Sequence, residues 1–326
     1  MKRPPVLDVI DLSVAFAQAR RLPWQRPTAV PVVRNVSFTI RRNEIIGLVG
    51  ESGSGKTTLS RALLRLLPAT SGTVRFDGID LLTLPAADLR RLRGRMQVIF
   101  QDPYTSLNPR MTAADNIAEG ISLQRLCDRR DIRARVAAVL DQVGLAPDAG
   151  SRFPHEFSGG QRQRIGIARA LAVEPELLIA DEPVSALDMS IQAQILNLLM
   201  EQQERRSLAM LFIGHDLSVI RHICDRVLVM YRGRIVETAP VAALFHHPAH
   251  PYTQALLDAA PVSHPSMRHR KRASLAEPVN FRSRPIGCPF AARCLHRIDA
   301  CDDALPPLRT IGHDHQVACI RSEIFR

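Results

Sequence analysis

The stretch that decides the fold reads Gly50-Glu51-Ser52-Gly53-Ser54-Gly55-Lys56-Thr57. It has the spacing Gly-x-x-x-x-Gly-Lys-Thr, and a short apolar segment at residues 45–49 runs straight into it. Residues 57–67 then carry leucines at helical spacing up to Pro68, so the loop joins a strand to a helix. In that context the glycines let backbone N–H groups curl around a phosphate, and the helix N-terminus adds partial positive charge.

Two side chains of this loop have expected roles in binding ATP and Mg²⁺. Lys56 reaches the β- and γ-phosphates, and the hydroxyl of Thr57 is a Mg²⁺ ligand. The other members contribute mainly backbone N–H groups. We therefore expect the following residues to contact ATP: Gly50, Glu51, Ser52, Gly53, Ser54, Gly55, Lys56, Thr57 and Thr58.

A second motif is an apolar run that ends in two acids, Leu177-Leu178-Ile179-Ala180-Asp181-Glu182. As a buried strand it would put both carboxylates at the carboxyl edge of a parallel sheet, beside the phosphate loop. Asp181 would hold Mg²⁺ through water, and Glu182 would polarise the attacking water. Alone, such a pair is more often a solvated strand end. Together with the loop it predicts ATP hydrolysis, which depends on positioning and charge stabilisation.

A third motif follows Phe157 and reads Ser158-Gly159-Gly160-Gln161. A Ser-Gly-Gly turn before a helix offers free N–H groups and a hydroxyl to another phosphate, although it can also be an ordinary helix cap. One nucleotide hardly needs two such phosphate sites. The motif therefore suggests that two chains share each ATP.

Strand and helix periods alternate along much of the chain, which predicts an α/β fold with a mainly parallel sheet. Strands are expected at residues 6–16, 32–40, 45–49, 96–100, 177–180 and 210–214. A helical stretch at about 104–166 lies between two core strands and indicates an inserted α-helical subdomain. After about residue 247 the chain becomes rich in Pro, His, Arg and Cys, which indicates a C-terminal appendage.

These motifs resemble the nucleotide-binding subunit of ATP-binding cassette (ABC) transporters, over essentially the whole chain. The loop resembles Walker A, residues 177–182 Walker B, and residues 158–161 the family signature. The resemblance implies a P-loop NTPase core with an N-terminal antiparallel β subdomain. It implies further roles for Gln101 (the Q-loop, on Mg²⁺), Asp188 (the D-loop) and His215 (the switch histidine). Phe16 matches the residue that stacks on adenine, with Trp24 as a competitor.

Residues 100–109 and 250–253 also resemble the ABC subfamily that imports peptides and nickel. The resemblance divides the chain into a cassette at 1–246 and an oligopeptide-transporter-type extension at 247–326. Peptide is the expected cargo, and nickel or another small solute is the alternative. Tyr104 and the insertion at 17–31 resemble the second ATPase of a pair, so a paralogous heterodimer is expected, with a homodimer as the alternative.

The subfamily resemblance implies further partners: two transmembrane permease subunits and an extracytoplasmic solute-binding protein. The chain itself would be a peripheral ATPase at the cytoplasmic face of the bacterial inner membrane. A rival class is a non-transport ABC ATPase that acts on nucleic acid or ribosomes. Its usual coiled-coil insertions, zinc hooks or fused second cassettes are not visible in this sequence.

Composition agrees with that placement. The net charge is +11, and the basic residues are dispersed apart from a cluster at 268–272. No interleaving of basic with aromatic residues suggests a base-stacking surface, so no nucleic-acid partner is expected. The sequence contains no run of 18 or more apolar residues, and its first residues do not resemble a signal peptide. A basic surface fits a protein close to anionic lipid.

Four cysteines lie near the C-terminus with the spacing C-x5-C-x6-C-x17-C: Cys288, Cys294, Cys301 and Cys319. A cytosolic chain argues against disulfides, and the spacing lacks the paired C-x2-C knuckles of zinc ribbons. Four thiolates suit either Zn²⁺ or a 4Fe-4S cluster, and free thiols are the third alternative. Some relatives of the subfamily carry such a cluster, so the resemblance favours iron–sulfur. The nearby His246, His247 and His250 are expected to be structural.

Overall fold

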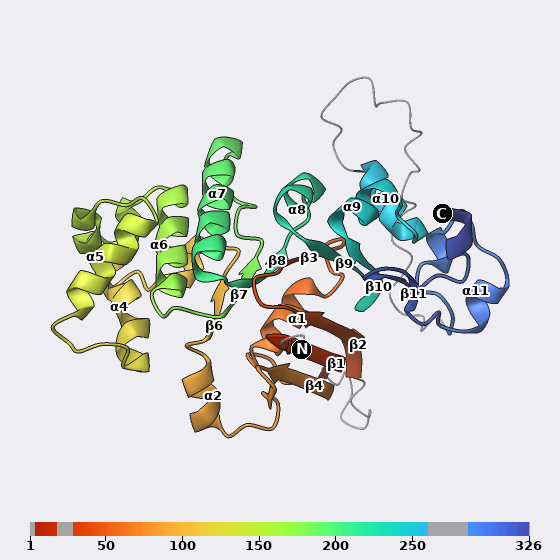
Figure 1. Ribbon diagram of the computed structural model, residues 1–326, viewed down its shortest axis with the longest axis horizontal. Helices are drawn as coiled ribbons and strands as arrows, with labels where there is room; N and C mark the ends of the chain where they lie inside the picture. Colours follow the sequence, from red (N-terminus) through yellow and green to blue (C-terminus); the bar gives the residue numbers. More distant parts are fainter. Residues whose placement is uncertain (1–3, 18–28, 260–285, 326) are drawn as a thin grey trace, which may run out of the picture.

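The computed structural model describes residues 4–17, 29–259 and 286–325. Within these residues the strands form two sheets, one of four strands and one of eight. Helices pack against the larger sheet, and a group of them extends to one side of the molecule (Figure 1). The expected α/β fold is confirmed.

The smaller sheet is antiparallel throughout. Its strands, in spatial order, are β2 (Ala29–Ile40), β1 (Leu7–Ala17), β4 (Ser71–Phe76) and β5 (Ile79–Asp80). Apolar side chains in β1 such as Leu7, Val9 and Val14 are buried, because one face of an antiparallel sheet can pack on a core while the other meets solvent. This sheet is the antiparallel β subdomain that the sequence resemblance implied.

The larger sheet has a parallel part, to which all the motifs of the nucleotide site are attached. Its parallel strands, in spatial order, are β6 (Met96–Ile99), β7 (Leu177–Asp181), β8 (Ala209–Ile213), β3 (Ile45–Val49) and β9 (Arg226–Tyr231). Strands β3, β7 and β8 are buried at every position, as expected of parallel strands that are covered on both faces.

Alternate residues of these strands point into two different hydrophobic cores. Ile46 and Leu48 of β3 pack with the smaller sheet, whereas Ile45 and Val49 pack with the helices on the opposite face. Because β3 is held from both faces, the loop that leaves its carboxyl end starts from a fixed position.

The helix after the phosphate loop, α1 (Lys56–Leu63), is shorter than the sequence pattern predicts. The expected end was Pro68, but Arg65 already adopts a left-handed conformation with φ 51°, and its N–H donates to the carbonyl of Ala62. A residue in that conformation ends a helix, so leucine spacing overestimated its length.

The inserted helices between β6 and β7 form one group in Figure 1, which also shows α2 (Ala86–Leu92) below the sheet. The group consists of α3 (Pro103–Ser106), α4 (Ala113–Gln124), α5 (Ile132–Gln142), the short 3-10 helices η1 (Pro147–Ser151) and η2 (Pro154–Glu156), and α6 (Gly159–Leu171). This arrangement fits an insertion at 104–166, although its limits stay a prediction.

The remaining helices follow in chain order. They are α7 (Met189–Arg206), α8 (Leu217–Ile223), α9 (Val241–His246), α10 (Pro251–Ala259), η4 (Ala291–Arg293), α11 (Ala300–Asp303) and η5 (Ser322–Phe325). Figure 1 shows α10 and α11 at the end of the molecule opposite to α4 and α5. In the described part of the chain, no helix is both long and apolar enough to span a membrane.

The C-terminal residues complete the larger sheet on its antiparallel side. There β9 is followed by β10 (Arg234–Pro240), β12 (His315–Val317) and β11 (Arg309–Gly312). Strand β12 pairs Val317 with Glu237 and Gln316 with Thr238. Part of the expected appendage therefore continues the sheet of the cassette, and the boundary at 246/247 stays a prediction.

Candidate nucleotide-binding and hydrolysis site

The phosphate loop leaves β3 at Val49 and enters α1 at Lys56, and its glycines are required sterically. A Cβ atom on Gly50 would lie 2.2 Å from the carbonyl oxygen of Met230. At Gly55 the backbone has φ 107°, which side chains rarely adopt, and a Cβ would lie 2.9 Å from the carbonyl of Val32. The loop therefore needs glycine at both ends to fold against its neighbours.

Lys56 lies inside the loop, and its ammonium group is held by loop carbonyls. Its Nζ donates to the carbonyl oxygens of Gly50, at 2.8 Å, and Glu51, at 3.1 Å. Burial lowers the pKa of Lys56, and the carboxylates of Glu182 and Asp181 partly offset that effect. The ammonium is thus partly desolvated and held by neutral acceptors, so a phosphate would be a stronger partner.

Asp181 ends β7 directly beside the start of α1. Its carboxylate accepts hydrogen bonds from the hydroxyls of Thr57, at 3.4 Å, and Ser60, at 3.3 Å. Burial raises the pKa of Asp181, and so does the neighbouring Glu182, while the two hydroxyls lower it. Hydroxyl and carboxylate oxygens are the donors that Mg²⁺ prefers, so Thr57 and Asp181 fit the metal assigned to them from the sequence.

Ser60 was missed by the sequence analysis. It lies one helical turn after Thr57 and is 2% exposed. A serine on the buried face of a helix, three residues after the expected Mg²⁺ ligand, was the signal that could have identified it.

Glu182 follows Asp181 and adopts φ 48°, a conformation that is uncommon for a residue other than glycine. Its backbone N–H donates to the carbonyl of Ile213, at 3.0 Å, which fixes the chain direction after β7. Residues held in such conformations cluster at active sites, where the surrounding structure determines the side-chain direction.

The side chains of Gln101 and His215 meet the carboxylate of Glu182. Gln101 Nε2 donates to Glu182 Oε2 at 3.0 Å, and His215 Nδ1 lies 3.4 Å from the same oxygen. The three residues follow β6, β7 and β8, which are neighbours in the sheet, so their carboxyl ends open at one edge. The structure therefore brings together the three residues expected to act in hydrolysis.

The signature residues are not brought to this loop. Ser158 instead caps α6: its hydroxyl accepts from the N–H of Gln161 at 3.4 Å, and its own N–H donates to Gln161 Oε1 at 3.1 Å. Figure 1 shows α6 beside α7, away from α1. Among the described residues, no hydrogen bond or ion pair links 158–161 to 50–57.

Gly160 and Asp188 connect the signature to the start of α7. A Cβ on Gly160 would lie 2.6 Å from Ile191 Cγ2, so only glycine allows α6 to approach α7 this closely. Asp188 is the N-cap residue of α7, but its side chain makes no capping hydrogen bond. Its carboxylate therefore does not cap the helix through a hydrogen bond, which is compatible with the contact to another subunit expected of the D-loop.

Phe16, the expected adenine platform, is near the end of β1 opposite Val30, and 42% of its surface is exposed. An exposed aromatic ring at a strand end can stack on a base. The competing residue, Trp24, lies outside the described residues. The assignment of Phe16 stays a prediction.

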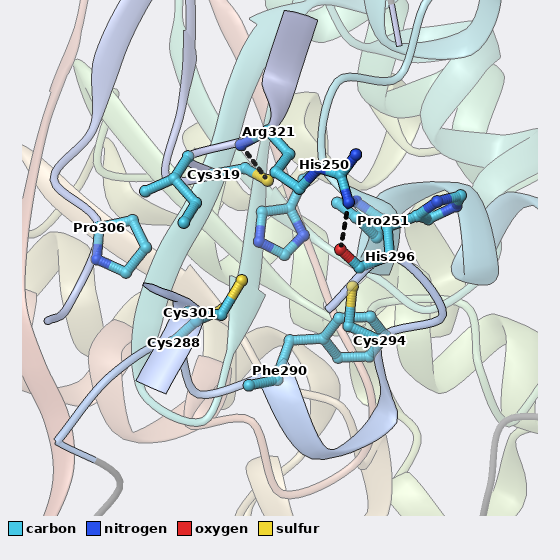
Figure 2. A pocket seen from close by; sticks show the side chains of 12 residues that line it. His250, Pro251, Cys288, Phe290, Cys294, His296, Cys301, Pro306, Cys319 and Arg321 are labelled. Carbon is cyan, nitrogen blue, oxygen red and sulfur yellow. Dashed lines mark hydrogen bonds between the residues drawn. The ribbon is translucent and has the colours of Figure 1, made fainter. Parts of the chain in front are cut away.

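The four C-terminal cysteines line one cavity of about 20 Å³ together with His250, Phe290 and Arg321 (Figure 2). Burial raises the pKa of Cys288, of Cys294 and, to about 11, of Cys319. However, the described residues contain no group of three His, Cys, Asp or Glu side chains that could hold a metal ion. The thiols gather as expected, but neither the 4Fe-4S cluster nor the zinc ion finds a formed ligand set here.

His250 is also buried at this cavity and plays the structural part expected of it. Its Nδ1 accepts from the N–H of Tyr252 at 3.0 Å, and burial lowers its pKa to about 4. The ring is therefore neutral at physiological pH and fixes the start of α10.

Two family models match the chain. Residues 33–185 match the model described as ABC transporter, and residues 236–301 match the model described as oligopeptide/dipeptide transporter, C-terminal region. The first match covers the phosphate loop, the signature and the two acids at the end of β7. The second covers most of β10, all of α9 and α10, and the first three of the four clustered cysteines.

Curated relatives match over nearly their whole length. A putative peptide import ATP-binding protein of Brucella ovis is 51% identical, with 99% of this chain and 100% of the relative covered. The oligopeptide transport ATP-binding protein OppF of Salmonella typhimurium is 45% identical, with 98% and 97% covered.

Solved structures share the fold of the cassette. A dimeric post-hydrolysis state of the ATP-binding cassette MJ0796, bound to ADP and phosphate, gives a TM-score of 0.65 at 26% identity, covering 72% of this chain and 98% of that one. CbiO1 from Clostridium perfringens, part of a transporter complex, gives 0.63 at 26% identity, with 74% and 90% covered.

Proposed function

The chain belongs to the ABC transporter family, in the group that carries the oligopeptide/dipeptide transporter C-terminal region, and from this premise we propose that it is the ATP-hydrolysing subunit of a peptide importer. Full-length similarity to proteins named for peptide import and oligopeptide transport supports peptide as the cargo class.

The convergence of Gln101 and His215 on the carboxylate of Glu182 is the observation that carries hydrolysis. These residues come from separate parts of the chain and meet at the sheet edge that also holds the phosphate loop. A structural role alone does not require an amide, an imidazole and a carboxylate to converge in this way.

The chain's own residues divide the work of phosphoryl transfer. Lys56 and the loop N–H groups hold the phosphates, and Thr57 and Asp181 would hold Mg²⁺, which neutralises phosphate charge when bound. Glu182 accepts a hydrogen bond from the attacking water and orients it. Gln101 and His215, which both lie beside one carboxylate oxygen of Glu182, hold that carboxylate in place.

Each site is completed by a second ATPase subunit in this proposal. The signature at 158–161 lies away from the phosphate loop of its own chain, so it is available to the loop of a facing chain (Figure 1). The MJ0796 cassette, which has the same fold, was solved as a dimer. Similarity to OppF is compatible with the expected pairing with a paralogous ATPase, and a pair of identical chains is the alternative.

The other partners follow from the importer class. Two permease subunits would carry the peptide, and an extracytoplasmic solute-binding protein would deliver it. The chain would then bind peripherally to the permeases at the cytoplasmic face of the inner membrane, and its charge of +11 favours a position near anionic lipid.

The replacement Glu182→Gln tests this function. We expect ATP hydrolysis to fall by about a hundredfold or more, because an amide orients water poorly and accepts no proton. Binding of ATP should persist, and size-exclusion chromatography with MgATP should show a trapped dimer with the partner ATPase or with a second copy.

The matched control is Glu174→Gln, which changes an acid whose side chain is 69% exposed and pairs with Arg135. It should leave hydrolysis unchanged. A Glu182→Gln protein that hydrolyses ATP at the wild-type rate would remove the basis of the assignment.

For the cysteine-lined cavity we keep a 4Fe-4S cluster as a proposal. The support for it is that four thiols from residues 288–319 line one cavity. In addition, a short segment without its own hydrophobic core would be stabilised by bonds from its thiolates to a cluster. In the described structure, the four thiols are not arranged as a metal-ligand set, so binding of a cluster would require these side chains to move. Iron, acid-labile sulfide and zinc contents of anaerobically purified protein decide between a cluster, a zinc site and free thiols.

A further inference from the structure

The second residue of the phosphate loop, Glu51, is held at three separate points. Its backbone N–H donates to the hydroxyl of Tyr252 at 2.9 Å, and its carbonyl accepts from Lys56 at 3.1 Å. Its carboxylate receives two hydrogen bonds from the guanidinium of Arg293, at 2.9 and 2.8 Å. Such a paired geometry fixes orientation as well as charge.

Two of these three partners come from the C-terminal extension rather than from the cassette. Tyr252 is in α10 and is completely buried. Arg293 ends η4, and its side chain is only 7% exposed. Glu51 and Arg293 are 242 positions apart in sequence, so the contact depends on the folded extension and not on the loop's own sequence.

Three packed aromatic rings give these contacts a rigid base. The ring centroids of Tyr231 and Tyr252 are 4.5 Å apart, and that of Phe290 lies 5.4 Å from Tyr231 and 5.5 Å from Tyr252. The Arg293 guanidinium lies over Tyr231 and Phe290, at 5.8 and 5.7 Å from their centroids. Phe290 also lines the cysteine cavity, as Figure 2 shows.

Electrostatics explains why an arginine is needed at this place. Glu51 belongs to the loop that receives the phosphates, and an unpaired carboxylate there would repel them. Arg293 offsets this charge, and its hydrogen bonds to Glu51 raise its own pKa. Its Nε is buried without a hydrogen-bond partner, whereas Nη1 and Nη2 bind Glu51, and Nη1 also donates to the hydroxyl of Tyr231 at 3.5 Å.

We propose that Arg293 and Tyr252 are positioning residues for ATP binding, which brace Glu51 so that the phosphate loop is already shaped for the nucleotide. The proposal rests on the ATPase function proposed above and deepens it. It gives the C-terminal extension a direct part in the nucleotide site. The brace acts on binding and not on the water-activating residues, since neither side chain has a hydrogen bond to Gln101, Glu182 or His215 in the described structure.

The test compares steady-state kinetics and nucleotide binding in full-length variants. Arg293→Ala should raise the KM for ATP about tenfold, equivalent to ~1.4 kcal/mol, with kcat changed by less than about twofold. Kd for the non-hydrolysed analogue AMP-PNP with Mg²⁺ should rise in parallel. Arg293→Lys keeps the positive charge but loses the paired hydrogen bonds of the guanidinium, so its affinity for ATP should lie between those of the wild type and Arg293→Ala.

The matched control is Arg297→Ala, in the same segment. Arg297 pairs with Asp302, is half-exposed and has no contact with the loop, so KM should stay at the wild-type value. Tyr252→Phe removes one oxygen and leaves the N–H of Glu51 without its acceptor, so it should also raise KM. That variant decides the question if Arg293→Ala does not fold.

A double-mutant cycle separates bracing from general damage to the fold. In a Glu51→Ala background, Arg293→Ala should change the Kd for AMP-PNP by less than about twofold, because the partner of the arginine is already gone. An unchanged KM in folded Arg293→Ala and in Tyr252→Phe, or an equal effect of Arg293→Ala with and without Glu51, would overturn the brace. A wild-type chain that does not bind MgATP would instead overturn the proposed function.

Discussion

Asp181 is an acid whose ionised form is disfavoured in the nucleotide-free chain. Burial raises its pKa, and the adjacent Glu182 raises it further. An acid with a raised pKa in the folded state binds more protons there than in the unfolded state. The free energy of unfolding therefore rises as pH falls towards the pKa of the unfolded state, and the ionised group is a cost at neutral pH.

We predict that Asp181→Asn raises the Tm of the nucleotide-free chain at pH 7, because the amide carries no charge to desolvate. The gain should be smaller at pH 5 than at pH 7, because protonation relieves the wild type of part of the same cost. With MgATP the order should reverse, since Mg²⁺ needs the carboxylate. Thermal unfolding at both pH values, with and without MgATP, checks this, and a variant that keeps the full Mg²⁺-dependent stabilisation would contradict it.

At the residue scale, the sequence was sufficient where a motif and its strand context coincide. Thr57, Asp181 and Glu182 could be placed together because parallel strands end at one sheet edge. Arg293 could not be placed, because its partner lies 242 positions away and no local pattern marks an arginine that will bind the phosphate loop. Ser60 was not predicted either, because a position within a helix does not by itself mark a serine as a partner of Asp181.

Among the elements, two helices begin with the same kind of cap. In α6 the cap is the pair Ser158 and Gln161, and in α4 it is Thr112 and Asp115, with hydrogen bonds of 3.1 and 3.3 Å between their backbone and side chains. Each of these residue pairs forms a capping box, whose side chains accept hydrogen bonds from backbone N–H groups at the start of the helix. The capping box of α6 is also part of the signature, which we propose binds the ATP held by a facing subunit.

This pairing gives a controlled prediction. Ser158→Ala and Thr112→Ala should each destabilise the chain by about 1 kcal/mol through the lost cap. Only Ser158→Ala should also reduce ATP hydrolysis by about tenfold, because its hydroxyl would bond to a charged phosphate group. ATPase rates and Tm of the purified variants are the measurements. Equal effects of the two replacements on ATP hydrolysis would show that Ser158 acts only as a helix cap.

The C-terminal hairpin shows why elements are harder to predict than motifs. Strand β12 is only three residues long, too short for an alternating pattern to be recognised. Its place depends on the buried carboxylate of Glu237, which accepts from His315 at 2.8 Å and from the N–H groups of Ala249, at 2.8 Å, and His250, at 2.9 Å. Tertiary contacts, and not local propensity, therefore fix this part of the sheet.

At the scale of the whole molecule, the two half-sites that we propose for this chain lie on different parts of it. The phosphate loop lies on the sheet, and the signature lies on the helical group beside it (Figure 1). In the proposed dimer, each phosphate loop would lie against the signature of the other chain, because a two-fold interface repeats every contact. In such a dimer, a defect in the phosphate loop of one chain would disable one ATP site. A defect in the signature of the same chain would disable the other ATP site.

If the facing subunit is a second copy of this chain, which is the alternative to the expected paralogous pair, that geometry predicts complementation between two inactive variants. Lys56→Ala removes the phosphate contact of the loop, and Ser158→Arg blocks the signature with a bulky side chain at an exposed position. Each should be inactive alone, but in an equal mixture half of the dimers contain both variants and one intact site. The mixture should thus recover about a quarter of the wild-type ATPase rate. If no activity returns, while each variant still unfolds at the wild-type temperature, the facing half-site belongs to a paralogous subunit and the experiment moves to that pair.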